Sequence, residues 1–443
     1  MPKSYALFGR HEPGAPVVWT DTGVYSSQAV AEMAKAVAGQ LPGVGADEAA
    51  VSIDVQGRLG FVVALLGAWL RGYVVRLGAP RAATDAESGS ADQWIHDGDR
   101  STGVDIRMVL RDRAGPRGAS NASIVLPAGQ RLVSLWTSGS TGEPQLHHKD
   151  ARQLLGEAEM LREAFGLQRA DRLLATAPPE HVYGLLFGVV LPLVSGSSFV
   201  DASPLQPTAV AAVRRAATAN VLVSVPAHLR ALVSLGPHEL DGLRRVFSSG
   251  APLLSDTARS LHQRHQVTVT EVLGSTETGG IAWREQVAAD TRWRALPGVK
   301  LQQDDAARLV VASPFLPDGI DRWTSAEHVT FASDGGFVHH GRIDGIVKVA
   351  GKRVALAELE RALFAMPGVT DAAVAAREIS GARGTEIAAL VVGDRLDAAG
   401  IRAALLRRFD RVVVPRRVAV VDRVPRGANG KVTKSAVFAA WDG

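Results

Sequence analysis

The sequence predicts an α/β protein with a large N-terminal α/β domain built from several subdomains, residues 1–343, and a small C-terminal α+β domain, residues 344–443. Three observations support this prediction. The 443 residues exceed the length of about 250–300 residues at which one hydrophobic core usually suffices. Strand-like and helix-like apolar runs alternate over most of the chain, which is typical of a largely parallel sheet covered by helices. The composition changes after Arg342, where shorter elements indicate a unit with its own core.

The N-terminal part contains an apolar run from residue 51 to 78, which predicts a buried helix followed by a strand. Residues 81–121 are polar and rich in Asp, Gly and Arg, so we expect surface loops there. A strand at 131–136 leads into a loop, and a helix follows with Asp150 placed to cap its first free amides. Strands and helices then alternate, in the segments RLLATA, VYGLLFGVVLPLV, NVLVSV, AHLRALVSL and RRVFSS.

A further strand that ends in a glycine turn is predicted at 267–275, and the residues from Trp293 to His340 indicate a small β-rich module. The C-terminal part predicts a hairpin, a helix, two strands, a second helix and a last strand, at 345–354, 355–366, 371–376, 386–393, 397–409 and 417–424. The polar connector around Asp344 lies between two strands, which is where a hinge between domains is expected.

The composition excludes several classes of function. With no cysteine, the chain cannot form disulfides, thiolate metal sites or a cysteine nucleophile. A net charge of +4 without a run of basic residues argues against nucleic-acid binding. The first residues lack the apolar core of a signal peptide, and the longest apolar stretch, Gly184 to Val194, is too short to span a bilayer. We therefore expect a cytoplasmic protein.

The sharpest functional signal is a loop placed directly after a predicted strand. Its glycines let backbone amides turn toward one point and its hydroxyls add short donors, which is how proteins hold an oligophosphate. A plain linker between strand and helix is the alternative. The ordinary P-loop pattern fails at the candidate lysines after Gly351 and Gly430, which disfavours a P-loop kinase or GTPase. The residues of the loop are Thr137, Ser138, Gly139, Ser140, Thr141, Gly142, Glu143 and Pro144.

With this loop the sequence resembles the adenylate-forming superfamily of acyl-CoA synthetases, adenylation domains and luciferases, and among them a compact stand-alone acyl or aryl acid AMP-ligase. The resemblance implies the adenylate-forming enzyme fold and a loop, Thr137 to Gly142, that embraces the ATP phosphates. Gln145 stands where the family usually has a lysine, and Lys149 is a candidate replacement.

Two further segments match the family in order. The loop of Gly250, Ala251 and Pro252 resembles the one that lies along adenine. The segment from Leu273 to Glu277 resembles the family's YGxTE element. The resemblance implies that Gly274, Ser275 and Thr276 contact ATP and that Glu277 holds magnesium, for which a carboxylate is a suitable ligand. Leu273 replaces the aromatic residue that stacks on adenine in the family.

The region near the predicted hinge also resembles the family. Arg342 would bind ribose or phosphate, Asp344 would be the pivot residue, and Glu327 occupies the position of an aspartate that grips the ribose. The alternative is that Arg342 and Asp344 form only a surface ion pair. The terminal Pro425 to Lys431 segment resembles the one whose lysine stabilises charge during adenylation, although an exposed turn would look the same.

The acid is expected to contact His181, Val182, Tyr183 and Gly184, because relatives that activate acyl or aryl acids place a histidine there. The alternative is a histidine that only caps a helix. No aspartate suited to an α-amine appears, which favours an acid without a free amine. The small residues Gly279 and Gly280 would leave room for a ring or chain.

The resemblance therefore implies an AMP-forming acid–thiol ligase with ATP and Mg²⁺ as cofactors. Its catalytic residues would be Lys431, His181 and Glu277, and Glu277 would be the metal ligand. The acceptor would be the thiol of coenzyme A or of the phosphopantetheine on an acyl carrier protein, because the chain offers no thiol of its own. Two alternatives stay open: a non-catalytic relative that binds nucleotide or acyl-adenylate, and an unrelated phosphotransferase.

Overall fold

The computed structural model describes residues 2–442 apart from 13, 46–48, 79–92, 99, 101, 112–122, 139–143, 289–290, 380–383, 428–429 and 431. The chain forms two compact units. The first contains 1–291, 295–300 and 312–323, and the second contains 292–294, 301–311 and 324–443. The second unit thus includes segments that precede Asp344, and the domain boundary at 343/344 stays a prediction. Among the described residues, no helix is long and apolar enough to cross a membrane.

The first unit contains a six-stranded sheet in the order β10-β9-β5-β4-β6-β7, parallel except for the antiparallel pair β9–β10. Helix α2 is buried from Arg58 to Trp69, and from Leu59 to Trp69 its residues are apolar on all sides. The strands are β4 (Ala50–Asp54), β5 (Val74–Leu77), β6 (Gln93–His96), β7 (Val104–Asp105), β9 (Arg131–Ser138) and β10 (Pro144–Asp150), with α1 (Ser27–Gln40), α2 (Arg58–Arg71) and α4 (Arg107–Arg111). A separate antiparallel pair joins β1 (Ser4–Leu7) and β8 (Ile124–Pro127).

Two local predictions in this sheet were wrong. Residues 81–121 were expected to be loops, yet β6, β7 and α4 fall within them. These elements are only two to five residues long, too short to show a period, and β6 exists because β4 pairs with it. Strand β10 was also missed, since its polar sequence PQLHHKD forms an edge strand held by β9.

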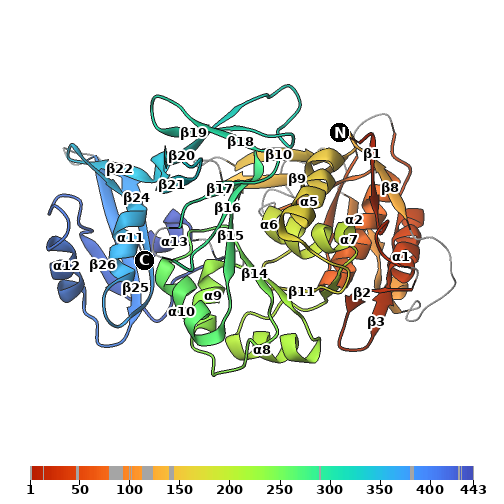
Figure 1. Cartoon of the computed structure of the whole chain (residues 1–443), viewed down its shortest axis with the longest axis horizontal. Coiled ribbons are helices and arrows are strands. Elements are labelled where there is room, and N and C mark those ends of the chain that lie inside the picture. Colours follow the sequence, from red (N-terminus) through yellow and green to blue (C-terminus); the bar gives the residue numbers. More distant parts are fainter. Residues whose placement is uncertain are drawn as a thin grey trace. The chain divides into compact units, whose positions relative to one another are not determined.

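A nine-stranded sheet in the order β17-β16-β15-β14-β13-β11-β12-β2-β3 completes the first unit. The run from β15 to β2 is parallel, as the alternation of strands and helices predicted, and β14, β15 and β16 lie side by side (Figure 1). The strands are β2 (Pro16–Trp19), β3 (Val24–Ser26), β11 (Arg172–Ala175), β12 (Ser198–Val200), β13 (Val221–Ser224), β14 (Arg245–Ser248), β15 (Val269–Ser275), β16 (Gly279–Glu285) and β17 (Arg294–Ala295).

Helices between these strands bury their apolar faces against the sheet, and one core joins side chains of β11, β13 and β14 to α8, α9 and α10. The predicted cap of α5 is confirmed: Asp150 accepts from the Gln153 amide at 2.7 Å, and the Gln153 side chain accepts from the Asp150 amide. The helical segments are α5 (Ala151–Phe165), α6 (Val182–Leu185), the π-helix η1 (Leu186–Val190), α7 (Leu191–Ser195), α8 (Pro207–Ala216), α9 (Pro226–Leu232) and α10 (Ser255–His265).

From β22 to β26 the elements match the predicted C-terminal order, and the helix α13 after them was not predicted. A four-stranded sheet in the order β18-β19-β20-β21 precedes the short helix η2 (Ile343–Gly345), and a three-stranded sheet in the order β24-β25-β26 carries the last core. The elements are β18 (Lys300–Gln303), β19 (Arg308–Ala312), β20 (Trp323–Phe331), β21 (Phe337–Arg342), β22 (Ile346–Val349), β23 (Lys352–Ala355), α11 (Leu356–Phe364), β24 (Val369–Glu378), β25 (Thr385–Gly393), α12 (Ala398–Leu406), β26 (Arg417–Val420) and α13 (Lys434–Phe438).

Candidate active site

Three predicted site segments follow parallel strands of the nine-stranded sheet. His181 to Gly184 come after β11, the loop at Gly250 comes directly after β14, and the turn at Glu277 comes directly after β15. Because β11, β13, β14 and β15 run in the same direction, their carboxyl ends meet at one edge of the sheet. That edge is where open α/β sheets bind their ligands.

The predicted adenine loop is held by hydrogen bonds to a buried carboxylate. Glu271 on β15 accepts a hydrogen bond from the Leu253 amide at 3.0 Å. The Gln286 side chain donates to both the Leu253 carbonyl oxygen, at 2.9 Å, and the Glu271 carboxylate, at 2.6 Å. Arg284 balances the charge of Glu271 in an ion pair. The anchored loop leaves Gly250, Ala251 and Pro252 exposed.

The predicted magnesium carboxylate lies in the turn between β15 and β16. The Thr278 amide donates to the Ser275 hydroxyl at 3.3 Å, and the two hydroxyl oxygens of Ser275 and Thr278 lie 3.1 Å apart. These contacts close the turn with Thr276 and Glu277 between them. Gly274 pairs with Gly280 across the hairpin after a shift in register.

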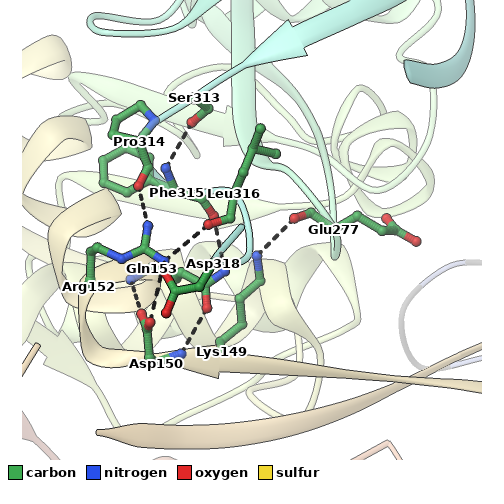
Figure 2. A network of polar contacts seen from close by, with 10 residues as sticks. All are labelled: Lys149, Asp150, Arg152, Gln153, Glu277, Ser313, Pro314, Phe315, Leu316 and Asp318. Carbon is green, nitrogen blue, oxygen red and sulfur yellow. Dashed lines mark hydrogen bonds and ion pairs between the residues drawn. The ribbon is translucent and has the colours of Figure 1, made fainter. Parts of the chain in front are cut away.

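Lys149 approaches this turn from β10. Only 2% of its surface is exposed, and its ammonium donates to the Glu277 carbonyl oxygen at 3.3 Å (Figure 2). Burial lowers the pKa of Lys149, while the carboxylates of Glu157, Glu277 and Asp150 oppose the shift. The buried ammonium therefore hydrogen-bonds to the backbone of the turn.

Glu157 on α5 is also buried, and its carboxylate accepts from the Gly280 amide at 2.6 Å. Burial raises the pKa of Glu157 to about 7, against the opposing effects of Lys149 and the Gly280 amide. A side chain at Gly279 would overlap the Glu157 carboxylate, and one at Gly280 would crowd it at 3.2 Å. Packing against Glu157 thus explains both glycines, and their contact with an acid stays a prediction.

The surroundings of Glu277 fit a magnesium ion held jointly with a nucleotide. Its side chain is 24% exposed, and the ring of His147 lies beside it, with Nε2 3.5 Å from Oε1. Among the described residues no group of three or more His, Cys, Asp and Glu side chains could hold a metal. Magnesium commonly binds through one or two carboxylates together with substrate phosphates, so one carboxylate suffices here.

The start of α5 is fastened to a second segment of the same unit, as Figure 2 shows. Arg152 donates to the carbonyl oxygens of Pro314 and Leu316 and to the Asp318 carboxylate, the last at 2.8 Å. Gln153 donates to another carbonyl of that segment at 3.2 Å. The first turn of the helix is thereby held independently of the Lys149 contact.

The predicted acid segment begins α6. His181 is the N-cap residue, but its side chain makes no capping hydrogen bond, so the helix-capping alternative is wrong. Val182 is partly buried, and burial raises the pKa of the Tyr183 hydroxyl. A side chain at Gly184 would overlap the Pro178 carbonyl oxygen, which requires glycine there whatever the substrate.

The second unit brings together Glu327 and Arg342, on neighbouring strands β20 and β21. The Arg342 guanidinium donates to Glu327 Oε1 at 3.1 Å, and His339 Nε2 approaches Oε2. The predicted ribose carboxylate is therefore already engaged by two partners. Asp344 lies in η2. Lys431 and the phosphate loop from Gly139 to Glu143 lie outside the described residues, which include Thr137 and Ser138 only as the end of β9.

The sequence reading did not single out Glu157, Glu271 or His147. Glu157 lies on the apolar face of α5 among Leu154, Ala158 and Leu161. A carboxylate on an apolar helix face indicates a buried charged group that needs a partner. Glu271 interrupts a buried strand in the same way. The residue type shows that a partner is needed, but only the fold shows which one.

Comparison with known proteins agrees with this geometry. Sequence models described as AMP-binding enzyme and AMP-binding enzyme C-terminal domain match residues 78–310 and 358–431. A 4-coumarate–CoA ligase of Halorhodospira halophila is 32% identical over 340 residues, 75% of this chain and 82% of that ligase. A p-hydroxybenzoic acid–AMP ligase of Mycobacterium tuberculosis is 30% identical over 74% of this chain and 53% of its own. The O-succinylbenzoate coenzyme A synthetase of Bacillus subtilis with AMP aligns at TM-score 0.78 over 95% of both chains, with 16% identity, which confirms the predicted fold.

Proposed function

The chain belongs to the AMP-binding enzyme family, and from this premise we propose that it activates a carboxylic acid with ATP and transfers the acyl group to a thiol. In the first step the carboxylate attacks the α-phosphorus of ATP, which gives acyl-adenylate and pyrophosphate. In the second step a thiol attacks the acyl carbon, which forms a thioester and releases AMP. The protein is therefore an AMP-forming acid–thiol ligase.

One observation carries the proposal: the adenine loop and the Glu277 turn follow neighbouring parallel strands and are each anchored by a buried charged residue, Glu271 and Lys149 respectively. This arrangement supports a nucleotide lying across the carboxyl edge of the sheet, with its base over the exposed Gly250 loop and its phosphates toward Thr276. The Glu277 carboxylate would then hold Mg²⁺, which neutralises phosphate charge when it is bound.

The roles of the remaining residues follow from where charge develops. Negative charge gathers on the α-phosphate as the carboxylate attacks, and a lysine ammonium delivered there stabilises the transition state more than the ground state. We assign this role to Lys431, and we assign carboxylate closure to His181. Arg342 and Glu327, which form an ion pair with each other, would contact the ribose.

We further propose an aryl or fatty acyl substrate without a free amine. The names of two relatives, a 4-coumarate–CoA ligase and a p-hydroxybenzoic acid–AMP ligase, support an aromatic acid. Since the chain has no cysteine, the acceptor thiol belongs to coenzyme A or to an acyl carrier protein. A cytoplasmic location stays a prediction.

The direct test is exchange of labelled pyrophosphate into ATP with a panel of acids, including hydroxybenzoate, hydroxycinnamate and medium-chain fatty acids. Exchange that depends on one acid, together with AMP formation when coenzyme A or a carrier protein is added, is the expected result. If ATP binds and no acid supports exchange, the chain is a nucleotide-binding relative without this activity. Release of inorganic phosphate without any acid would point to a phosphotransferase.

A further inference from the structure

The hairpin that carries Glu277 is held at two points by buried side chains, one lysine and one glutamate. Lys149, from β10, donates to the Glu277 carbonyl oxygen, and Glu157, from α5, accepts from the Gly280 amide. Both side chains are 2% exposed, and each is the other's principal electrostatic partner. One contact holds the backbone before Thr278, at the Glu277 carbonyl, and the other holds it after Thr278, at the Gly280 amide.

The hairpin needs such an external constraint because its own sequence is flexible. Gly274, Gly279 and Gly280 lie within it, and Gly279 has a φ of +69°, in the left-handed region that favours glycine. Three glycines around one carboxylate leave the backbone free to reorient in the absence of other contacts. A functional carboxylate must be held within a fraction of an ångström to act reliably.

The direction of the Glu277 side chain follows from this constraint. Figure 2 shows the Glu277 carbonyl oxygen directed at Lys149 and the carboxylate extending away from it. Fixing the carbonyl therefore sets the direction in which the Glu277 side chain leaves the backbone, and His147 lies beside its carboxylate. The Lys149 ammonium is buried against the turn, and whether it replaces the lysine missing at Gln145 stays a prediction.

We propose that Lys149 and Glu157 form a buried positioning pair that orients the Glu277 carboxylate toward the metal–nucleotide site. The proposal rests on the proposed function for what Glu277 binds, but not for the constraint itself. Neither residue touches the reacting atoms. Lys149 sets the orientation of the carbonyl. Glu157 holds the Gly280 amide in either protonation state, and neutralises the buried ammonium when it is ionised.

The test compares three variants, Lys149→Met, Glu157→Gln and the double variant. Each single change leaves the other side chain without its partner and can lower the free energy of unfolding. The double variant removes both charges, keeps similar volumes, and leaves a glutamine oxygen that can still accept from the Gly280 amide. We expect it to fold with a melting temperature close to that of the wild type. Lys35→Met is the matched control, because Lys35 is an exposed lysine whose ion pair with Glu32 lies within α1.

Two readouts separate positioning from stability. In the protein without ligands, hydrogen–deuterium exchange of the peptide covering 272–284 should be several-fold faster in the double variant and unchanged in Lys35→Met. The Mg²⁺ concentration at half-maximal ATP binding, measured by calorimetry, should rise about tenfold, as for other residues that orient a metal ligand. The apparent KM for the acid should change little.

Several results would overturn the proposal. A double variant with wild-type exchange and wild-type Mg²⁺ dependence would show that the pair has no positioning role, and a double variant that does not fold would make it a core stabiliser only. Failure of the proposed function is distinguishable, because the wild type would then give no exchange of pyrophosphate with any acid while the deuterium readout still tested the pair.

Discussion

Replacing Glu157 by glutamine is expected to remove the loss of stability that the Glu157 carboxyl itself causes between about pH 5 and pH 8. Burial raises the pKa of the Glu157 carboxyl to about 7 from its ordinary 4.5. Between these two values the folded protein binds more protons than the unfolded chain, so the free energy of unfolding falls as the pH rises. One pKa unit corresponds to about 1.4 kcal/mol, and integrating over this pH range gives a loss of about 2–3 kcal/mol from this one group.

The assay is urea unfolding at a series of pH values, for the wild type and for Glu157→Gln, with the difference in slope against pH as the quantity of interest. Glu163→Gln is the matched control, since it removes an exposed carboxylate from the same helix, α5. The wild type and the control should lose stability in parallel, and Glu157→Gln should lose about 2–3 kcal/mol less across the range. Identical slopes in all three proteins would show that the Glu157 carboxyl is ionised at ordinary pH and that burial does not govern its titration.

Three further outcomes are expected. Gly184→Ala should lower the free energy of unfolding in urea by about 1–3 kcal/mol, because its Cβ would overlap the Pro178 carbonyl. The control is Gly39→Ala, in an α1 position with open space, which should raise the free energy of unfolding by about 0.5–1 kcal/mol. Equal effects of the two substitutions would contradict the packing argument. Glu271→Gln should raise the KM for ATP in pyrophosphate exchange more than it lowers kcat, since the adenine loop loses the charged group that holds the Leu253 amide. An unchanged KM would show that Glu271 does not position the loop for ATP. Lys431→Ala should slow adenylation far more than thiol transfer from preformed acyl-adenylate, and equal losses in the two half-reactions would refute its assignment.

The elements predicted correctly are those whose signals are local. Asp150 caps α5 because its side chain reaches an amide only three residues away, and a buried parallel strand such as β13 is a continuous apolar run. The strand β10 was missed for the opposite reason. Its polar residues have weak strand preference, and the pairing with β9 that forms the strand is not encoded in those residues.

For the candidate site, too, some features were predicted from the sequence and others were not. The order of its motifs was sufficient to predict the family and the reaction class, since each motif is a short run of residues with its own chemistry. The lack of cysteine was sufficient to assign the acceptor thiol to a partner. The contact of Lys149 with the Glu277 carbonyl oxygen could not be read from the sequence, where Lys149 was only a candidate substitute for the lysine absent at Gln145.

The tertiary structure decided the partners of the buried charges. Lys149 and Glu277 are 128 residues apart, and Glu157 and Gly280 are 123 apart, yet each pair forms a hydrogen bond. A residue type and its neighbours determine which chemistry a side chain can perform and whether it can be buried without a partner. Which partner it meets depends on how the β9–β10 edge and α5 pack against the β15–β16 hairpin, and that packing is the summed result of apolar contacts along the whole unit.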